Sequence, residues 1–296
     1  MDRVLDPLLL GLSFGAIYAL VALGLVVVYR GTGHLNLAQG EMGTLSAYIA
    51  WLVASWGLPL WAATIAAMVF GFSFAAATEL VIVRPLSQRS PLTVFVALVA
   101  VFLGINAFTT GLWGATPQES IGTVFPPGFT RVFGSVWRYD AIGNLVVALV
   151  VSGLLYVLFQ RTKVGLAMRA VASNPDSSRL VGVPTGAVLA GSWGLAGALA
   201  ALAGTLVATG NTTVTPNLMF TWFVYASAAA VLGGLDSPLG AVVAGLGIGI
   251  VENFAAEWAP AWIGQSMRLA VALLCIFVVL LVRPSGLFGS PRVERV

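Results

Sequence analysis

Four amide and carboxyl side chains lie within or beside long apolar stretches, where a polar group is costly and needs a function. They are Asn36, Gln39, Glu41 and Asn106. The first three belong to residues 33–41, a Gly-containing segment that interrupts the apolar pattern. Backbone groups freed by such a break are satisfied only within protein or beside water. We therefore predict that these four residues line a pathway for a small polar solute. In the alternative interpretation, Glu41 bonds the free backbone amides of the break and Asn106 bonds a neighbouring helix.

A second segment, residues 233–240, interrupts the apolar pattern late in the chain and resembles the first. The matched positions are Gly33 and Gly233, Leu35 and Leu235, and Gly40 and Gly240, while Asn36 corresponds to Asp236. Paired broken segments in the two halves of a transporter often mark its binding site. The pair therefore indicates a transport pathway, and two ordinary turns at the membrane surface are the alternative.

Residue types that perform catalysis or bind metals are scarce. His34 and Cys275 are the only residues of their types in the sequence, which excludes a multi-histidine metal site, an internal disulfide and a CxxC pair. The sequence also contains no phosphate-binding GxxxxGK[ST] and no HExxH. We predict a non-catalytic protein with no cofactor and no metal.

The composition places most of the chain in a membrane. Hydrophobic residues make up 59% of the sequence and charged residues 8%, whereas about 25% of a typical soluble domain is charged. The predicted fold class is all-α, a polytopic transmembrane helical bundle of about eight or nine spans with broken or re-entrant segments. We expect it to form one domain over residues 1–296. The candidate spans are residues 7–29, 40–56, 60–83, 92–113, 141–159, 186–208, 218–232, 239–258 and 263–282.

Several features of these stretches predict how they behave. The stretch 218–232 is shorter than the ~20 residues that cross a bilayer, so we expect it to enter the membrane part-way. Glu79 and Glu257 lie near span ends and are expected to reach the interface. Small residues recur at helical spacing within 186–208, which predicts close helix approach. They are Gly191, Gly194, Gly197, Ala201 and Gly204.

The basic residues give an orientation. With nine crossings, three groups of basic residues and Arg30 fall on the same side of the membrane. Loops rich in Arg and Lys are usually cytoplasmic. We therefore expect the carboxyl terminus to be cytoplasmic and the amino terminus to be outside. The groups are Arg84 and Arg89; Arg161, Lys163, Arg169 and Arg179; and Arg283, Arg292 and Arg295.

The cytoplasmic loop, residues 160–185, contains a short helix with signals at both ends. Asn174 is a good N-cap, Pro175 suits the first helical position, and Asp176 suits the positive end of the helix dipole. Gly182 then ends the helix. Leu180 and Val181 would be exposed on it, which predicts docking in a groove of a partner protein. A helix that lies on the membrane surface is the alternative.

Five segments, in this order, resemble the permease subunits of branched-chain amino acid ABC importers over nearly the whole chain. Residues 11–20 are similar to the first span of that family, and residues 36–41 match its N-x-A-[HQ]-G-E element. Residues 169–182 are similar to its cytoplasmic loop, and the segments 233–241 and 283–289 complete the set. Gln39 stands where His is frequent, Asp236 where Gly is frequent, and Ser178 where Ala is frequent.

The resemblance implies a permease subunit that forms half of the translocation pathway of an ATP-driven importer. It implies a multi-pass protein of the bacterial inner membrane, embedded in lipid, without nucleic acid. The implied partners are a second homologous permease, two cytoplasmic ATP-binding subunits and an extracytoplasmic solute-binding protein. The residues expected at the ATPase interface are Arg169, Asn174, Pro175, Asp176, Ser177, Arg179 and Gly182.

The cargo and one alternative function stay open. Branched-chain amino acids are the cargo that the resemblance implies, and urea, short amides or organic acids are the alternatives, because Gln39 and Asp236 depart from the family pattern within the broken segments. An ATP-independent secondary transporter or channel is the alternative function. It would need proton- or sodium-coupling carboxylates deep in the spans, whereas the candidate carboxylates here cluster near span ends.

Overall fold

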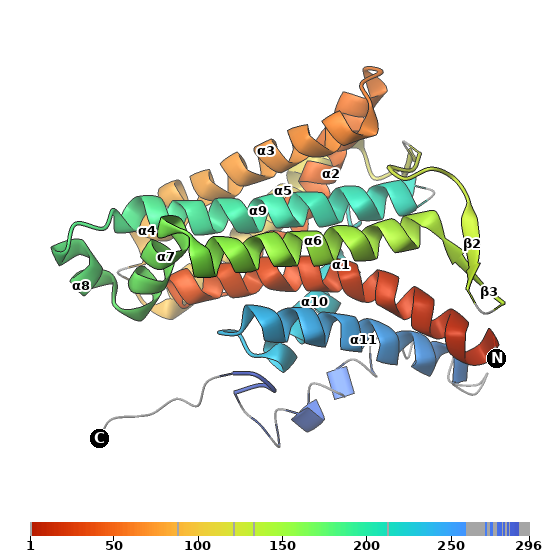
Figure 1. Cartoon of the computed structure of the whole chain (residues 1–296). Coiled ribbons are helices and arrows are strands. Elements are labelled where there is room, and N and C mark those ends of the chain that lie inside the picture. Colours follow the sequence, from red (N-terminus) through yellow and green to blue (C-terminus); the bar gives the residue numbers. More distant parts are fainter. Residues whose placement is uncertain are drawn as a thin grey trace. The chain divides into compact units, whose positions relative to one another are not determined.

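The computed structural model describes residues 2–87, 89–120, 122–132, 134–211 and 213–258, and between 270 and 289 it describes residues 270, 273–274, 277–279, 281, 283 and 285–289. In these parts of the chain, six helices are long and apolar enough to cross a membrane (Figure 1). They are α1 (Asp2–Thr32), the continuous segment Leu60–Leu86, α5 (Pro91–Trp113), α6 (Tyr139–Arg161), α9 (Thr185–Gly210) and α11 (Pro238–Trp258). The predicted all-α polytopic fold is confirmed.

Shorter elements connect the long helices. The segment Leu60–Leu86 consists of α3 (Leu60–Thr78), a π-helical turn η1 (Glu79–Val83) and α4 (Arg84–Leu86). Two short antiparallel pairs join β1 (Gln118–Glu119) to β4 (Thr213–Val214) and β2 (Phe129–Val132) to β3 (Ser135–Arg138). The remaining helices are α2 (Gln39–Ser55), α7 (Lys163–Ser173), α8 (Pro175–Leu180) and α10 (Phe220–Gly233).

The chain forms two compact units. The first unit comprises Met1–Val26, Phe125–Val150 and Thr221–Val296, and the second comprises Val27–Val124 and Val151–Phe220. The second unit therefore contains α2, α3, α5 and α7–α9, and it holds the first broken segment and the loop of residues 160–185. The first unit contains most of α1, α10 and α11, and it holds the second broken segment.

Two of the nine predicted spans are short helices. The stretch 40–56 forms α2, which has 17 residues, and the stretch 218–232 forms α10, which has 14. Neither reaches the ~20 residues of a full crossing. The length of α10 agrees with the expectation that 218–232 enters the membrane part-way. The expectation that 40–56 forms a span is corrected, because α2 is not among the six helices long and apolar enough to cross. The stretch 263–282, with Cys275, lies almost wholly outside the described residues.

Glycine allows α2, α3 and α9 to pack closely in the second unit. A Cβ atom on Gly71 would lie 2.6 Å from the carbonyl oxygen of Gly197, and one on Gly43 would lie 2.9 Å from the carbonyl oxygen of Ala200. Side chains at these positions would force the helices apart, which confirms the predicted close packing for Gly197 and Gly204 of α9 but not for Gly191, where a Cβ would meet nothing within 4 Å. Large buried residues, among them Met42 and Trp193, fill the adjacent core.

Candidate functional site

The first broken segment lies in the interior of the second unit. Asn36, Ala38, Gln39 and Glu41 are fully buried. The helix that follows, α2, begins beside the second halves of α5 and α9, because Glu41 contacts Asn106 and Gly43 packs on Ala200. A chain break at this depth favours the broken-segment interpretation over a turn at the membrane surface.

Asn36 satisfies the backbone of the break. Its Oδ1 atom accepts from the amide of Ala38 at 3.2 Å, and its carbonyl oxygen accepts from the amide of Gln39 at 3.2 Å. Its Nδ2 atom lies 3.5 Å from the sulfur of Met42. The alternative role considered for Glu41, bonding the free amides of the break, is therefore performed by Asn36, as an Asx turn.

Glu41 instead belongs to a polar cluster formed with Asn106, Pro216 and Asn217. The Nδ2 atom of Asn106 lies 3.3 Å from Oε2 of Glu41, 3.3 Å from the carbonyl oxygen of Pro216 and 3.0 Å from Oδ1 of Asn217. The structure thus joins two of the four predicted pathway residues directly. Pro216 and Asn217 were missed by the sequence analysis, although a turn-forming Pro-Asn pair immediately before an apolar stretch is a signal that could have found them.

The segment that carries Asn217 is fixed to α2 by two further contacts. The amide of Met219 donates to Oγ1 of Thr44 at 3.2 Å, and the hydroxyl of Tyr48 donates to the carbonyl oxygen of Val214 at 3.5 Å. Tyr48 also packs on Trp113 at the end of α5, with ring centroids 4.8 Å apart. These contacts place the polar cluster between α2, α5 and the residues before α10.

The loop of residues 160–185 contains the predicted short helix as α8. The Oδ1 atom of Asn174 accepts from the amide of Ser177 at 2.9 Å, Pro175 is the first helical residue, and Gly182 has a φ of +83°. Both ends therefore form as predicted. Leu180 and Val181 are 89% and 78% exposed.

A second loop helix, α7, was not predicted. Thr162 caps it by accepting from the amide of Gly165 at 3.1 Å, and Gly165 packs on the end of α6. Arg169 lies on α7, not on α8, and donates to Oε1 of Gln160 at 2.6 Å. The remaining predicted docking residues, Asp176 and Arg179, are exposed on α8.

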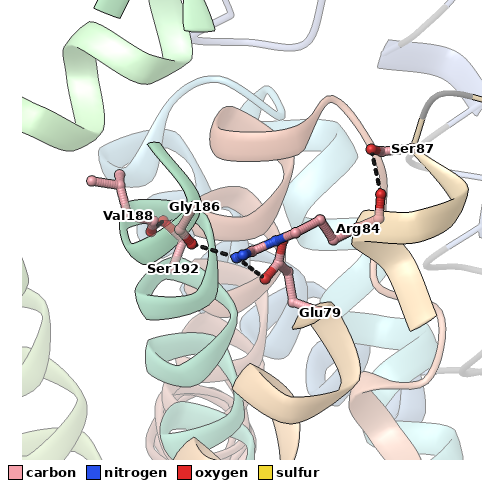
Figure 2. Close-up of polar contacts among 6 residues, drawn as sticks. All are labelled: Glu79, Arg84, Ser87, Gly186, Val188 and Ser192. Atoms are coloured by element: carbon pink, nitrogen blue, oxygen red, sulfur yellow. Dashed lines mark hydrogen bonds and ion pairs between the residues drawn. The ribbon is translucent and has the colours of Figure 1, made fainter. Parts of the chain in front are cut away.

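Glu79 and Arg84 form an ion pair that the sequence analysis also missed. Glu79 is 1% exposed and is paired with Arg84, whereas Glu257 is exposed, and the expectation that both reach the membrane interface stays a prediction. Figure 2 shows the guanidinium of Arg84 between two groups: Nη2 lies 2.7 Å from Oε2 of Glu79 and 2.5 Å from the carbonyl oxygen of Gly186. The π-helical turn that begins at Glu79 positions its carboxyl group for this contact.

This ion pair joins the end of α3 to the first turn of α9, and α9 follows α8 in the chain. Arg179 of α8 donates to Oγ1 of Thr185 at 2.9 Å, next to Gly186. Gly31, near the end of α1, also lies close to Ser192 of α9. Arg30, Arg84 and the loop with Arg179 therefore occupy the same end of the second unit, and the assignment of this end to the cytoplasm stays a prediction.

In the first unit, the second broken segment packs against residues 285–289. The amide of Leu287 donates to the carbonyl oxygen of Leu232 at 2.8 Å, and the amide of Phe288 donates to that of Gly233 at 3.1 Å. Gly234 has a φ of +102°, and a Cβ there would lie 2.6 Å from the amide nitrogen of Gly289. Two of the sequence segments that carried the family resemblance are therefore in direct contact.

Comparisons with known proteins agree with these features. Residues 8–281 match the family described as the permease component of branched-chain amino acid transport systems. The high-affinity branched-chain amino acid transport system permease protein BraD of Pseudomonas aeruginosa is 32% identical, with 99% of this chain and 98% of that protein covered. The corresponding permease protein LivH of Escherichia coli is 27% identical, with 97% and 96% covered.

One solved structure supports the fold. A metal-chelate type ABC transporter in an inward-facing conformation matches with a TM-score of 0.51 and 18% sequence identity, and 94% of this chain and 85% of that chain are covered. At this identity the likeness concerns the fold alone.

Proposed function

The chain belongs to the family of permease components of branched-chain amino acid transport systems, and on this basis we propose that it forms half of the translocation pathway of an ATP-driven importer of these amino acids. It is a non-catalytic, multi-pass membrane subunit. A second homologous permease supplies the other half of the pathway, two cytoplasmic ATP-binding subunits supply the energy, and an extracytoplasmic binding protein delivers the cargo. The bacterial inner membrane is the proposed location, with the carboxyl terminus in the cytoplasm.

The observation that carries the ATP-driven role is the exposed, doubly capped helix α8. Its apolar tip, Leu180 and Val181, is 89% and 78% exposed, which leaves two adjacent apolar side chains for the groove of a partner. The caps at Asn174 and Gly182 make the helix rigid enough to transmit a rigid-body shift from an ATP-binding subunit. Arg169, Pro175, Asp176, Ser177 and Arg179 complete the proposed interface.

The proposed pathway contains the four residues identified from the sequence. Asn106 and Glu41 line it through the polar cluster, and Asn36 and Gln39 hold the break beside it. Asn106 is half-buried and Asn217 is exposed, so the cluster can be reached from the surface of the second unit. A permease that receives cargo from a binding protein needs only weak contacts here, because cargo must also be released.

Reconstitution in liposomes tests this function. We expect the chain, assembled with its paired permease and ATP-binding subunits, to take up leucine only when ATP and the binding protein are present. The double substitution Leu180→Glu with Val181→Glu should lower uptake at least about tenfold, because charged side chains cannot enter an apolar groove. Uptake of leucine by the isolated chain without ATP would overturn the proposal and favour a secondary transporter.

A matched control separates docking from general damage. Val136 in β3 is 52% exposed and lies outside α7 and α8. Val136→Glu should leave uptake and assembly unchanged. Equal loss of uptake in the two variants would contradict a specific role for α8. Uptake of urea, acetamide or a short organic acid in place of leucine would identify the alternative cargo.

A further inference from the structure

One amide nitrogen in the polar cluster has more acceptors around it than it has hydrogens. The Nδ2 atom of Asn106 faces a carboxylate oxygen of Glu41, the carbonyl oxygen of Pro216 and the amide oxygen of Asn217, all at 3.0–3.3 Å. A primary amide has two N–H groups. One of the three acceptors is therefore always without a proton donor from Asn106.

Glu41 lacks a counter-charge. Its side chain is fully buried, its Oε1 atom has no hydrogen-bond partner among the described residues, and no Arg or Lys of those residues pairs with it. A carboxylate buried without a cation is expensive. In contrast, the other fully buried carboxyl group of this unit, Glu79, is neutralised by Arg84. The polar cluster thus lacks both a third proton donor and a positive charge.

We propose that the polar cluster binds the primary ammonium group of the cargo in the transporting state. In the structure described here, the side-chain amide of Asn106 occupies the position of that ammonium group. An ammonium group has three N–H donors and one positive charge, which match the three acceptors and the carboxylate of Glu41. The inference rests on the proposed function and narrows its cargo. The ammonium group enters past Asn217, which is exposed, and displaces the half-buried side chain of Asn106 by rotation of that side chain.

The arrangement discriminates between the cargo classes left open by the sequence. Urea and short amides carry neutral N–H groups, so they leave the charge of Glu41 uncompensated. Organic acids carry only negative charge, and Glu41 repels them. An amino acid supplies the missing cation. The polar cluster therefore selects zwitterions with a free amino group, whereas the side chain of the cargo is recognised elsewhere.

Charge-selective labelling tests the inference independently of the binding protein. Phe220 is 49% exposed, and its amide donates to the carbonyl oxygen of Asn217 at 3.2 Å. In the assembled transporter with Cys275→Ser, we expect Phe220→Cys to react at least about tenfold faster with a cationic trimethylammonium thiosulfonate than with the anionic sulfonate analogue. Glu41→Gln should abolish the preference, and Glu41→Asp, which keeps the charge, should retain it.

Protection by cargo analogues completes the test. Leucine and leucinamide, which have the ammonium group, should slow the labelling of Phe220→Cys, whereas 4-methylpentanoate, which lacks it, should not. Equal protection by leucine and 4-methylpentanoate, or a charge preference that survives Glu41→Gln, would overturn the inference. ATP-dependent leucine uptake by the same preparation is measured in parallel. If uptake is absent the proposed function fails, and if uptake is present without selective protection only the ammonium site fails.

Discussion

The guanidinium of Arg84 binds the carbonyl oxygen of Gly186 at 2.5 Å, which ties the end of α3 to the first turn of α9 (Figure 2). The same guanidinium neutralises the buried carboxyl group of Glu79. Because Thr185 also binds Arg179 of α8, two direct contacts connect α8 with Arg84 through the first turn of α9. The proposed docking role of α8 requires such a rigid connection between the docking helix and the core.

Removal of Arg84 should destabilise the protein more than removal of its partner. Arg84→Leu leaves the carboxyl group of Glu79 buried and unpaired, at a cost of about 1–3 kcal/mol. Glu79→Leu costs less, because the side chain of Arg84 is 38% exposed and keeps Gly186 as an acceptor. Thermal unfolding in detergent measures the difference. The double variant, Arg84→Leu with Glu79→Leu, should be more stable than Arg84→Leu alone. If the two substitutions instead lower stability additively, the result would argue against the ion pair.

Substitution of Gly182 should show the effect of backbone strain alone, without a steric clash. Its φ is +83°, and a Cβ there would meet nothing within 4 Å. Gly182→Val therefore adds only the strain of a β-branched residue in the left-handed region, about 1–2 kcal/mol, which should loosen the end of α8. We expect more ATP hydrolysed per leucine imported. Gly182→Asn is the control, because Asn tolerates this conformation, and equal coupling in the two variants would exclude a role for the helix end.

Two glycines of α9 should differ sharply in their tolerance of a methyl group. Gly197 packs against the backbone of Gly71 in α3, whereas a Cβ on Gly191 would meet nothing within 4 Å. Gly197→Ala should lower stability by about 1–3 kcal/mol through overpacking. Gly191→Ala should be neutral or stabilising, because Ala favours a helix over Gly. Expression level and unfolding temperature check both variants, and the same effect at both positions would refute the close α3–α9 contact.

Cysteine labelling tests the placement of the break beside the pathway. With Cys275 replaced, Asn36→Cys and Gln39→Cys should be unreactive toward a water-soluble reagent in the conformation described here, because both positions are fully buried. Each should react in at least one nucleotide state. Leu45→Cys, in the apolar core of the same unit, is the control that should stay unreactive. Absence of labelling at 36 and 39 in every state would remove both residues from the pathway.

The sequence alone was sufficient for features that depend on local chemistry. Apolar stretches of about 20 residues require a membrane and a helix to satisfy their backbone, so the all-α bundle followed from composition and length. The caps of α8 also followed, since Asn174, Pro175 and Gly182 act on amides and carbonyls within a few residues of themselves. Residues 36–41 also carried the family resemblance, because an Asx turn that interrupts a helix depends only on consecutive residues.

Only the tertiary structure decided which distant residues meet. Asn217 lies 111 positions from Asn106, and Gly186 lies 102 positions from Arg84, so no spacing along the chain could indicate either contact. The sequence predicts a span over residues 40–56, yet α2 is a helix of 17 residues that begins at the buried break, with Gln39 and Glu41 in its first turn. Glu79 stands near a span end in the sequence, and the folded chain buries it because a π-helical turn and the first turn of α9 enclose it with Arg84. Packing between elements, rather than local propensity, determines these positions.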